Sequence, residues 1–172
     1  YKRIITVTKN NFYINKEEKI IAFSQVHYQH YSTGYKMFKE NILFGVGPKM
    51  FRHKCDDLEY IVSNYSCSTH PHNTYLQLLS ETVFFVTLII FLIFCYLILK
   101  SLKHFYLRIF EKKIIFNDFQ IALLSSFLIT LWPIAPTGNF FNNWLSIIYF
   151  YPVGIFLSTL QYQKNFFRRQ DS

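Results

Sequence analysis

Apolar and polar residues are unevenly distributed along this chain: a polar first half is followed by three long apolar stretches. The first, residues 83–99, contains no charged residue and would span roughly 25 Å as a helix, against a bilayer hydrocarbon core of about 30 Å. The segment before it, HNTYLQLLSET, contains no helix breaker, so we expect the helix to begin there and continue without interruption.

The second apolar stretch covers residues 119–135 and is closed by Pro133 and Pro136, and the third covers residues 141–160. Pro152 and Gly154 lie inside the third, and such residues are tolerated in membrane helices where neighbouring helices satisfy the freed backbone groups. The pattern therefore predicts three transmembrane helices, at residues 83–100, 119–136 and 142–161.

The polar first half, residues 1–82, predicts a loop of short helices. Tyr31, Tyr35 and Phe38 recur on one helix face and predict a helix at residues 27–41, which the run ILFGVGP ends. Residues Ile4–Val7 have β propensity. The expected fold is mainly α: a polytopic membrane protein with a loop of short helices before three transmembrane helices.

The charges predict how these helices are oriented. The segment 101–118 and the tail 162–172 are rich in Lys and Arg, whereas the short segment 137–141 contains none. Basic segments next to a membrane helix stay in the cytoplasm, and loops longer than about 60 residues are exported largely regardless of charge. We therefore expect residues 1–82 on the exported side of the membrane and the C-terminus in the cytoplasm.

The composition agrees with a membrane protein, since 51% of the 172 residues are hydrophobic and only 16% are charged. The net charge of +8 does not indicate nucleic-acid binding, because many of the basic residues flank apolar stretches. The partners expected from this pattern are membrane lipids. The chain begins at Tyr1 with no basic start leading into a short apolar run, and we expect it to be a piece of a longer protein.

Two of the three cysteines, Cys55 and Cys67, lie in the segment expected to be exported, where disulfides persist. A bridge between them would close a short loop before the histidines and stabilise it by roughly 3 kcal/mol. Cys95, inside the first apolar stretch, is expected to pack.

The segment His70-Pro71-His72-Asn73 is the first candidate for chemistry. Pro71 suits the first turn of a helix, which would place His72 at the helix N-terminus on the exported side. The positive end of a helix dipole disfavours a charged imidazole, and a neutral histidine is a competent general base near pH 7.

Other interpretations of the histidines remain open on the residues alone. His70 and His72 have a spacing that can chelate a metal, and His27, His30 and His53 supply further imidazoles, although no carboxylate cluster or cysteine pair accompanies them at ligand spacing. A structural role, capping the helix or packing at the interface, is the third interpretation.

The turn Phe44–Pro48 is the second candidate. Gly45 and Gly47 would let the backbone approach an anion, while Lys49 and Arg52 would add positive charge suited to a diphosphate. The alternative is an ordinary turn followed by solvated basic residues.

Together, GYKMFKENILFGVGPKMFRHKC and CSTHPHNTYLQLLSET before an apolar stretch resemble the O-antigen ligase and polymerase family. The resemblance covers about Val26 to Val86, and LWPIAPTGNFFNNW matches more loosely. It implies a metal-independent, inverting glycosyltransferase without cofactor. It also implies a bacterial inner-membrane protein with residues 1–82 in the periplasm. Such an enzyme moves a glycan from undecaprenyl diphosphate to a sugar hydroxyl, on lipid A-core for a ligase or on another glycan for a polymerase.

Carried over to this chain, the family's catalytic histidine falls on His72, with His70 and Asn73 in support and Arg52 as the diphosphate-binding arginine. Val83 and Val86 stand where the family usually has glycines after the HN pair, which could impair this copy. The alternatives are a polysaccharide polymerase, a protein O-oligosaccharyltransferase, a metal- or partner-binding membrane protein without enzymatic activity, and a gene remnant.

Overall fold

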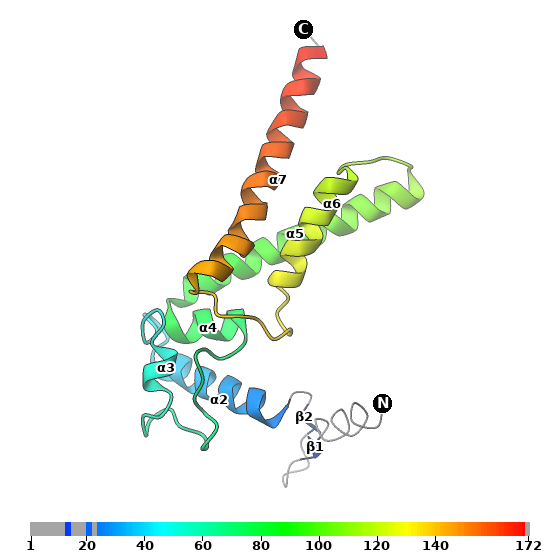
Figure 1. Cartoon of the computed structure of the whole chain (residues 1–172). Coiled ribbons are helices and arrows are strands. Elements are labelled where there is room, and N and C mark those ends of the chain that lie inside the picture. Colours follow the sequence, from blue (N-terminus) through cyan, green and yellow to red (C-terminus); the bar gives the residue numbers. More distant parts are fainter. Residues whose placement is uncertain (1–12, 15–19, 22–23, 171–172) are drawn as a thin grey trace. The chain divides into compact units, whose positions relative to one another are not determined.

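The computed structural model describes the backbone of residues 13–14, 20–21 and 24–170 and the side chains of residues 24–162. Within these ranges the chain is mainly helical, as predicted, with six helices and one short pair of strands (Figure 1). The strands β1 (Tyr13–Ile14) and β2 (Ile20–Ile21) pair in antiparallel fashion. The stretch Ile4–Val7 lies outside the described residues.

The chain divides into two compact units, each with its own hydrophobic core. The first unit comprises the described residues up to Thr87 together with the segment Pro136–Asn139. The second comprises Leu88–Ala135 and the described residues from Phe140 onward.

The first unit contains α2 (Gln25–Glu40), α3 (Phe51–Lys54) and α4 (Thr74–Glu81), and α2 packs against α4 (Figure 1). The hydroxyl of Ser24 accepts a hydrogen bond from the backbone N–H of His27 and caps the start of α2. The helix predicted at residues 27–41 therefore begins two residues earlier and ends one residue earlier than expected.

The core of this unit consists of Met37, Phe51, Cys55 and Tyr60, with Val46 packed against it. Met37 and Phe51 are completely buried, and burying one side chain of this size contributes about 1.5–3 kcal/mol. Cys55 is joined to Cys67 by a disulfide, with their Cα atoms 5.1 Å apart. The disulfide ties this core to the loop that leads into α4.

The helix expected to run without interruption from the histidines into the first apolar stretch is broken after Glu81. Thr82 has an extended backbone, and its hydroxyl donates to the carbonyl oxygen of Leu78 over 2.6 Å, closing α4 before α5 (Phe84–Phe110) begins. Gly45 lies against this break, since a Cβ on it would come within 2.6 Å of Glu81 and Thr82 backbone atoms. The break thus coincides with a contact from a distant segment, which local sequence does not reveal.

The second unit contains most of α5 together with α6 (Asp118–Thr130) and α7 (Asn143–Gln170), and α6 packs against α7 (Figure 1). Asn117 and Gln120 form a capping box at the start of α6. The side chain of Gln120 also donates to the Thr159 hydroxyl on α7 over 3.2 Å. Its core consists of Phe116, Leu124, Phe127 and Phe156.

The helix bounds differ from the prediction in three places. The first ten residues of the expected loop 101–118 are helical, because no Gly or Pro stops α5 before Phe110. The expected helix 119–136 ends at Thr130, since Pro133 and Pro136 follow it. The expected helix 142–161 continues to Gln170.

Two helices in the described part of the chain, Phe84–Phe110 and Asn143–Tyr162, are long and apolar enough to cross a membrane. In their most apolar stretches only 17% and 6% of the residues are buried, which is unlike the core helix of a soluble protein. The helix between them, α6, has 13 residues and spans roughly 20 Å, less than a hydrocarbon core of about 30 Å.

Candidate functional site

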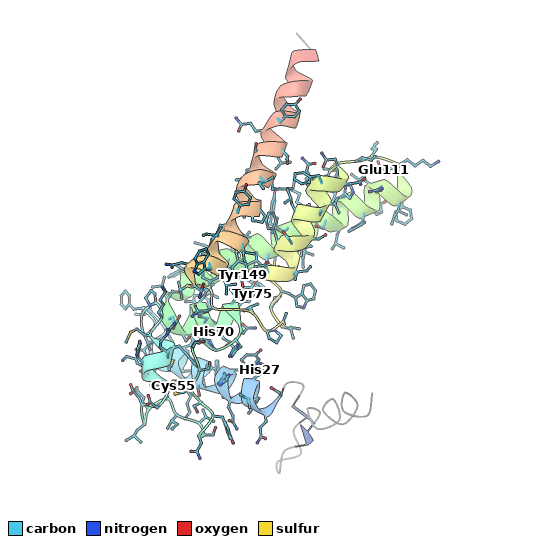
Figure 2. All side chains as sticks on the ribbon, viewed as in Figure 1. His27, Cys55, His70, Tyr75, Glu111 and Tyr149 are labelled. Carbon is cyan, nitrogen blue, oxygen red and sulfur yellow. A yellow bond between two sulfur atoms is a disulfide. The ribbon has the colours of Figure 1, made fainter. Side chains whose placement is uncertain are left out.

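Four of the six histidines come together in the first unit and are called here the histidine cluster: His27, His30, His70 and His72. His27 and His30 lie three residues apart on one face of α2, and the other two lie on the loop before α4 (Figure 2, which labels His27 and His70). His53, on α3, is exposed and is not a member.

His72 lies at the centre of the cluster. The centroid of its ring is 5.3 Å from that of His27, 5.3 Å from that of His30 and 4.2 Å from that of His70. The rings of His30 and His72 are stacked, at an interplanar angle of 28°, while His27 meets His72 edge-on.

The start of α4 differs from the prediction that Pro71 occupies the first helical turn. The helix begins at Thr74, and its cap is Asn73, whose side-chain oxygen accepts from the backbone N–H groups of Tyr75 and Leu76 over 3.0 and 3.1 Å. Asn73 caps the helix, whereas Pro71 lies two residues earlier, buried in the loop. His72 therefore precedes the cap.

Contact with α2 fixes the loop on one side. Pro71 is fully buried next to Gly34, where an added Cβ would lie 3.4 Å from the Pro71 Cβ. This distance is an ordinary van der Waals contact, so the position has room for a methyl group, but a larger side chain would meet Pro71 and Phe51.

The segment Pro136–Asn139 fixes the other side of the loop. The backbone N–H of Thr137 donates to the His72 carbonyl oxygen over 3.0 Å, and the hydroxyls of Thr74 and Thr137 are 2.9 Å apart. The backbone of His72 is left-handed, with φ at 56°, which costs a residue with a side chain on the order of 1–2 kcal/mol. These contacts hold His72 in that conformation, and strained backbone of this kind gathers at functional sites.

The ring of His70 is committed at both nitrogens. Nε2 lies 3.1 Å from the carbonyl oxygen of Thr137, which can only accept, so Nε2 donates and Nδ1 accepts from the Thr69 hydroxyl at 2.9 Å. His27 pairs through Nδ1 with the Ser24 hydroxyl at 2.9 Å. His70 is thus a structural support of the loop.

The ring nitrogens of His72, in contrast, make no hydrogen bond with any residue that the structure describes. The side chain is half-buried. The Nδ1 of His30 also lacks a partner, but His30 is buried, so His72 is the member of the cluster with an unbonded ring that is also partly exposed to a ligand.

Burial lowers the pKa of three members of the cluster: His30, His70 and His72. For His72, positive charge on His70 or His27 would lower the pKa further. The hydrogen bond with Thr137 partly offsets the lowering for His70. The cause is therefore burial and crowding, where the sequence suggested the helix dipole, but the consequence is the same: His72 is neutral near pH 7.

The glycine turn packs against the end of α4. Gly45 and Gly47 have positive φ, at 64° and 105°, and the backbone N–H of Val46 donates to the Ser80 carbonyl oxygen over 2.8 Å. The N–H of Gly45 donates to Asn41 over 2.8 Å. These donors, which we expected to face a diphosphate, are used within the protein, and the glycines allow the turn to contact α4 closely.

Glu81 joins α4 to the start of α3. Its carboxylate is completely buried and accepts from the backbone N–H of Phe51 over 2.7 Å and from the side chain of Gln77 over 2.9 Å. Burial raises the pKa of this carboxyl, against hydrogen bonds from Phe51, Gln77 and Lys49 and the positive charge of Arg52, which lower it.

Arg52 and Lys49 present exposed side chains next to these groups. The positive charge of Arg52 lowers the pKa of both His70 and Glu81, which places the guanidinium within electrostatic reach of the histidine loop. The structure thus brings Arg52, His70, His72 and Asn73 into one region.

Three parts of this region were not predicted from the sequence: the buried pair Gln77 and Glu81, the pairing of α2 with the histidine loop, and the segment Pro136–Asn139. The spacing of Gln77 and Glu81 on one helix face is a signal for the first. Nothing local signals the others, because they depend on contacts between distant parts of the chain.

Metal-ligand atoms converge within 4.8 Å at one place in the described residues, the group Cys55, Asp56 and Cys67. Its two sulfur atoms form the disulfide, so it offers no thiolate ligand. The cluster of imidazoles is the other place in the described region where nitrogen ligands are concentrated.

Comparison with known proteins adds no relative to this picture: no protein-family model, curated protein or solved structure matches the chain.

Proposed function

We propose that this chain forms the catalytic loop and adjoining membrane helices of a glycosyltransferase of the O-antigen ligase kind. It would move a glycan from undecaprenyl diphosphate to a sugar hydroxyl of lipid A-core. The observation that carries the proposal is His72. Its half-buried ring makes no hydrogen bond with the described residues, its pKa is lowered, and its backbone is fixed in the left-handed region.

In the proposed reaction, His72 takes the proton of the acceptor hydroxyl while that oxygen attacks the anomeric carbon of the donor sugar. The bond from this carbon to the diphosphate oxygen breaks, and the electron pair leaves with the diphosphate. Because one displacement occurs, the anomeric configuration is inverted. His72 returns its proton to water.

The second requirement is positive charge beside the leaving diphosphate, whose developing negative charge it stabilises. The exposed side chains of Arg52 and Lys49 meet it, and the guanidinium of Arg52 offers two parallel donors to phosphate oxygens. The backbone N–H groups of the glycine turn take no part in this version of the site.

The proposed topology follows the charge pattern. Residues 1–82 would face the periplasm, α5 and α7 would cross the membrane, and residues 111–117 and the tail would lie in the cytoplasm. The second crossing would combine α6 with the apolar residues up to Ala135 that follow it. Donor and acceptor are both lipids, so a catalytic loop next to α5 would meet them at the bilayer surface.

The near alternatives, a polysaccharide polymerase and a protein O-oligosaccharyltransferase, use the same donor with a different acceptor. A non-enzymatic metal-binding role is the alternative for the four gathered imidazoles, although in the described residues no three of their ligand nitrogens lie within 4.8 Å of one another. That alternative predicts bound zinc or copper in the purified protein and no effect of the gene on surface glycans.

Complementation of a ligase-deficient Gram-negative strain tests the proposal, using the full-length gene unchanged, with His72→Ala, or with the control His53→Ala. We expect lipid A-linked glycan ladders with the unchanged gene and the control, and none with His72→Ala at equal membrane levels. Ladders with all three would refute the catalytic histidine. If the unchanged gene gives none, the ligase proposal fails, and the length and attachment of the glycans would then identify a polymerase or a protein acceptor.

A further inference from the structure

A line of hydrogen bonds crosses the first unit from α3 to the segment Pro136–Asn139. It begins at the backbone N–H of Phe51, which donates to Glu81 Oε1 over 2.7 Å. The side-chain nitrogen of Gln77 donates to Glu81 Oε2 over 2.9 Å and to Asn139 Oδ1 over 2.8 Å. Three segments far apart in the sequence are therefore joined by two side chains of α4.

The same segment continues the connection to the catalytic loop. Thr137, two residues before Asn139, donates from its backbone N–H to the carbonyl oxygen of His72 and accepts from the ring of His70. The line thus runs from the residue next to Arg52 to the backbone of His72.

The central members of this line are buried, and their polar character needs an explanation. Gln77 and Glu81 are both 0% exposed, and a buried carboxylate is costly unless it is hydrogen-bonded. An apolar pair at these two positions would fill the same space without that cost. Replacing both partners of a buried hydrogen bond by apolar side chains of similar shape often leaves stability unchanged. What an apolar pair would lack is direction, since it could not fix the N–H of Phe51 relative to Asn139.

We infer that Glu81 is a positioning residue that holds Arg52, the donor end of the site, at a fixed place relative to His72. Arg52 directly follows Phe51, whose N–H Glu81 holds, so the carboxylate fixes the start of α3 and with it the backbone that carries Arg52. The inference rests on the proposed function, because it assigns Arg52 to the donor diphosphate.

Glu81→Gln is the first test variant. It retains an oxygen for Phe51 but removes the negative charge, so the bond from Gln77 is no longer charge-assisted, and Gln77 and Asn139 must both rotate their amides to pair again. The double variant Gln77→Glu with Glu81→Gln exchanges the two groups and restores a donor–acceptor pair. Asn139 can then rotate its amide and donate to the carboxylate at position 77. Glu40→Gln, at an exposed position at the end of α2, is the matched control.

The measurement is glycan transfer by the full-length protein in membrane vesicles, at varied concentrations of undecaprenyl-diphosphate-linked glycan with a lipid A-core acceptor. We expect Glu81→Gln to raise the donor KM about tenfold, and the exchange variant to return it to within about threefold of the unchanged protein. The control should leave it unaltered. Misfolding would instead lower kcat with the amount of active protein and leave the donor KM unchanged.

A second variant keeps the test decisive if Glu81→Gln does not accumulate. Gln77→Ala leaves Glu81 bonded to Phe51 but removes the connection to Asn139, and it should raise the donor KM about threefold. If the unchanged protein transfers glycan and these variants keep its donor KM, Glu81 has no positioning role. If the unchanged protein transfers none, the proposed function fails and this inference fails with it.

Discussion

The backbone N–H of Thr137 donates to the carbonyl oxygen of His72 over 3.0 Å, although two long apolar stretches separate these residues in the sequence. The carbonyl oxygen of Thr137 also accepts from the ring of His70. Thr137 therefore holds the histidine loop from outside the segment that contains it. The backbone conformation of His72, the candidate base, therefore depends on Thr137, which follows α5 and α6 in the sequence.

The variant pair Thr137→Pro and Thr137→Ala tests this dependence. Proline removes the N–H that holds His72, whereas alanine retains the backbone bonds and loses only the hydroxyl contact with Thr74. We expect lipid A-linked ladders to disappear with Thr137→Pro. With Thr137→Ala they should only weaken, because the loss of one hydrogen bond costs about 1 kcal/mol. Equal ladders from both variants, at equal protein levels, would show that the backbone bond is dispensable.

The acid dependence of transfer follows from the pKa of His72. Burial holds this pKa below its ordinary value of 6.5, so the base remains neutral and active as the pH falls to 6.5 and loses activity only below it. The measurement is the initial rate of transfer in vesicles between about pH 5 and pH 8. An acidic limb centred above 6.5 would contradict the assignment of His72 as the base.

The stability of the first unit should fall with acid as well. The pKa values of His30, His70 and His72 are lowered in the folded chain, so their contribution is present above 6.5 and is lost as the pH falls through the folded values. Glu81 acts in the opposite direction, because its raised pKa favours folding most below 4.5. Amide exchange in α4 measures the sum, and His30→Gln should reduce the acid dependence above about pH 5.

Gly45 and Gly154 form a matched pair for testing the glycine turn. A Cβ at Gly45 would lie 2.5–2.6 Å from Glu81 and Thr82 backbone atoms, whereas nothing lies within 4 Å of one at Gly154 in α7. We expect Gly45→Ala to destabilise the first unit by more than about 2 kcal/mol and Gly154→Ala to be neutral or stabilising. Limited proteolysis of the purified full-length protein compares the two, and equal resistance would contradict the close contact.

The disulfide provides a further test of the first unit. Replacing Cys55 and Cys67 by serine should destabilise this unit by about 3 kcal/mol, because the loop between them regains freedom in the unfolded chain. Cys95→Ser, which removes the cysteine without a disulfide partner in α5, should have no such effect. Protease sensitivity with and without reductant is the measurement. A pair variant as resistant as Cys95→Ser would show that the bond contributes nothing.

Local patterns predicted the elements whose residues carry their own signals. The periodic aromatic residues of α2 predicted its place to within two residues, although they do not form its buried face. Tyr35 is exposed, and the buried residues of the helix are His30, Thr33, Gly34 and Met37. The helical class and two helices able to cross a membrane also follow from composition, which a long apolar run makes plain.

Other features could not be predicted because their causes lie elsewhere in the chain. The break after Glu81 coincides with a contact from Gly45, and His27 and His30 meet the histidine loop because α2 packs on α4. α6 ends at Thr130, before the prolines that follow it. The sequence shows these prolines, but we expected them to mark the end of a helix as long as the whole apolar stretch, and the helix is shorter. The position of Pro71 before the cap is a similar case, since burial prevailed over its preference for a first turn.

Gly34 has no chemistry of its own, and yet it sets the distances within the histidine cluster. Glycine in the middle of α2 weakens the helix by about 1 kcal/mol relative to alanine, and the gap to Pro71 admits a methyl group but nothing larger. A bulkier side chain would push the loop outward and separate the imidazoles of one side from those of the other. Random mutagenesis followed by selection for lost surface glycan should therefore recover leucine or phenylalanine at position 34 as readily as changes at His72, while alanine should pass unnoticed.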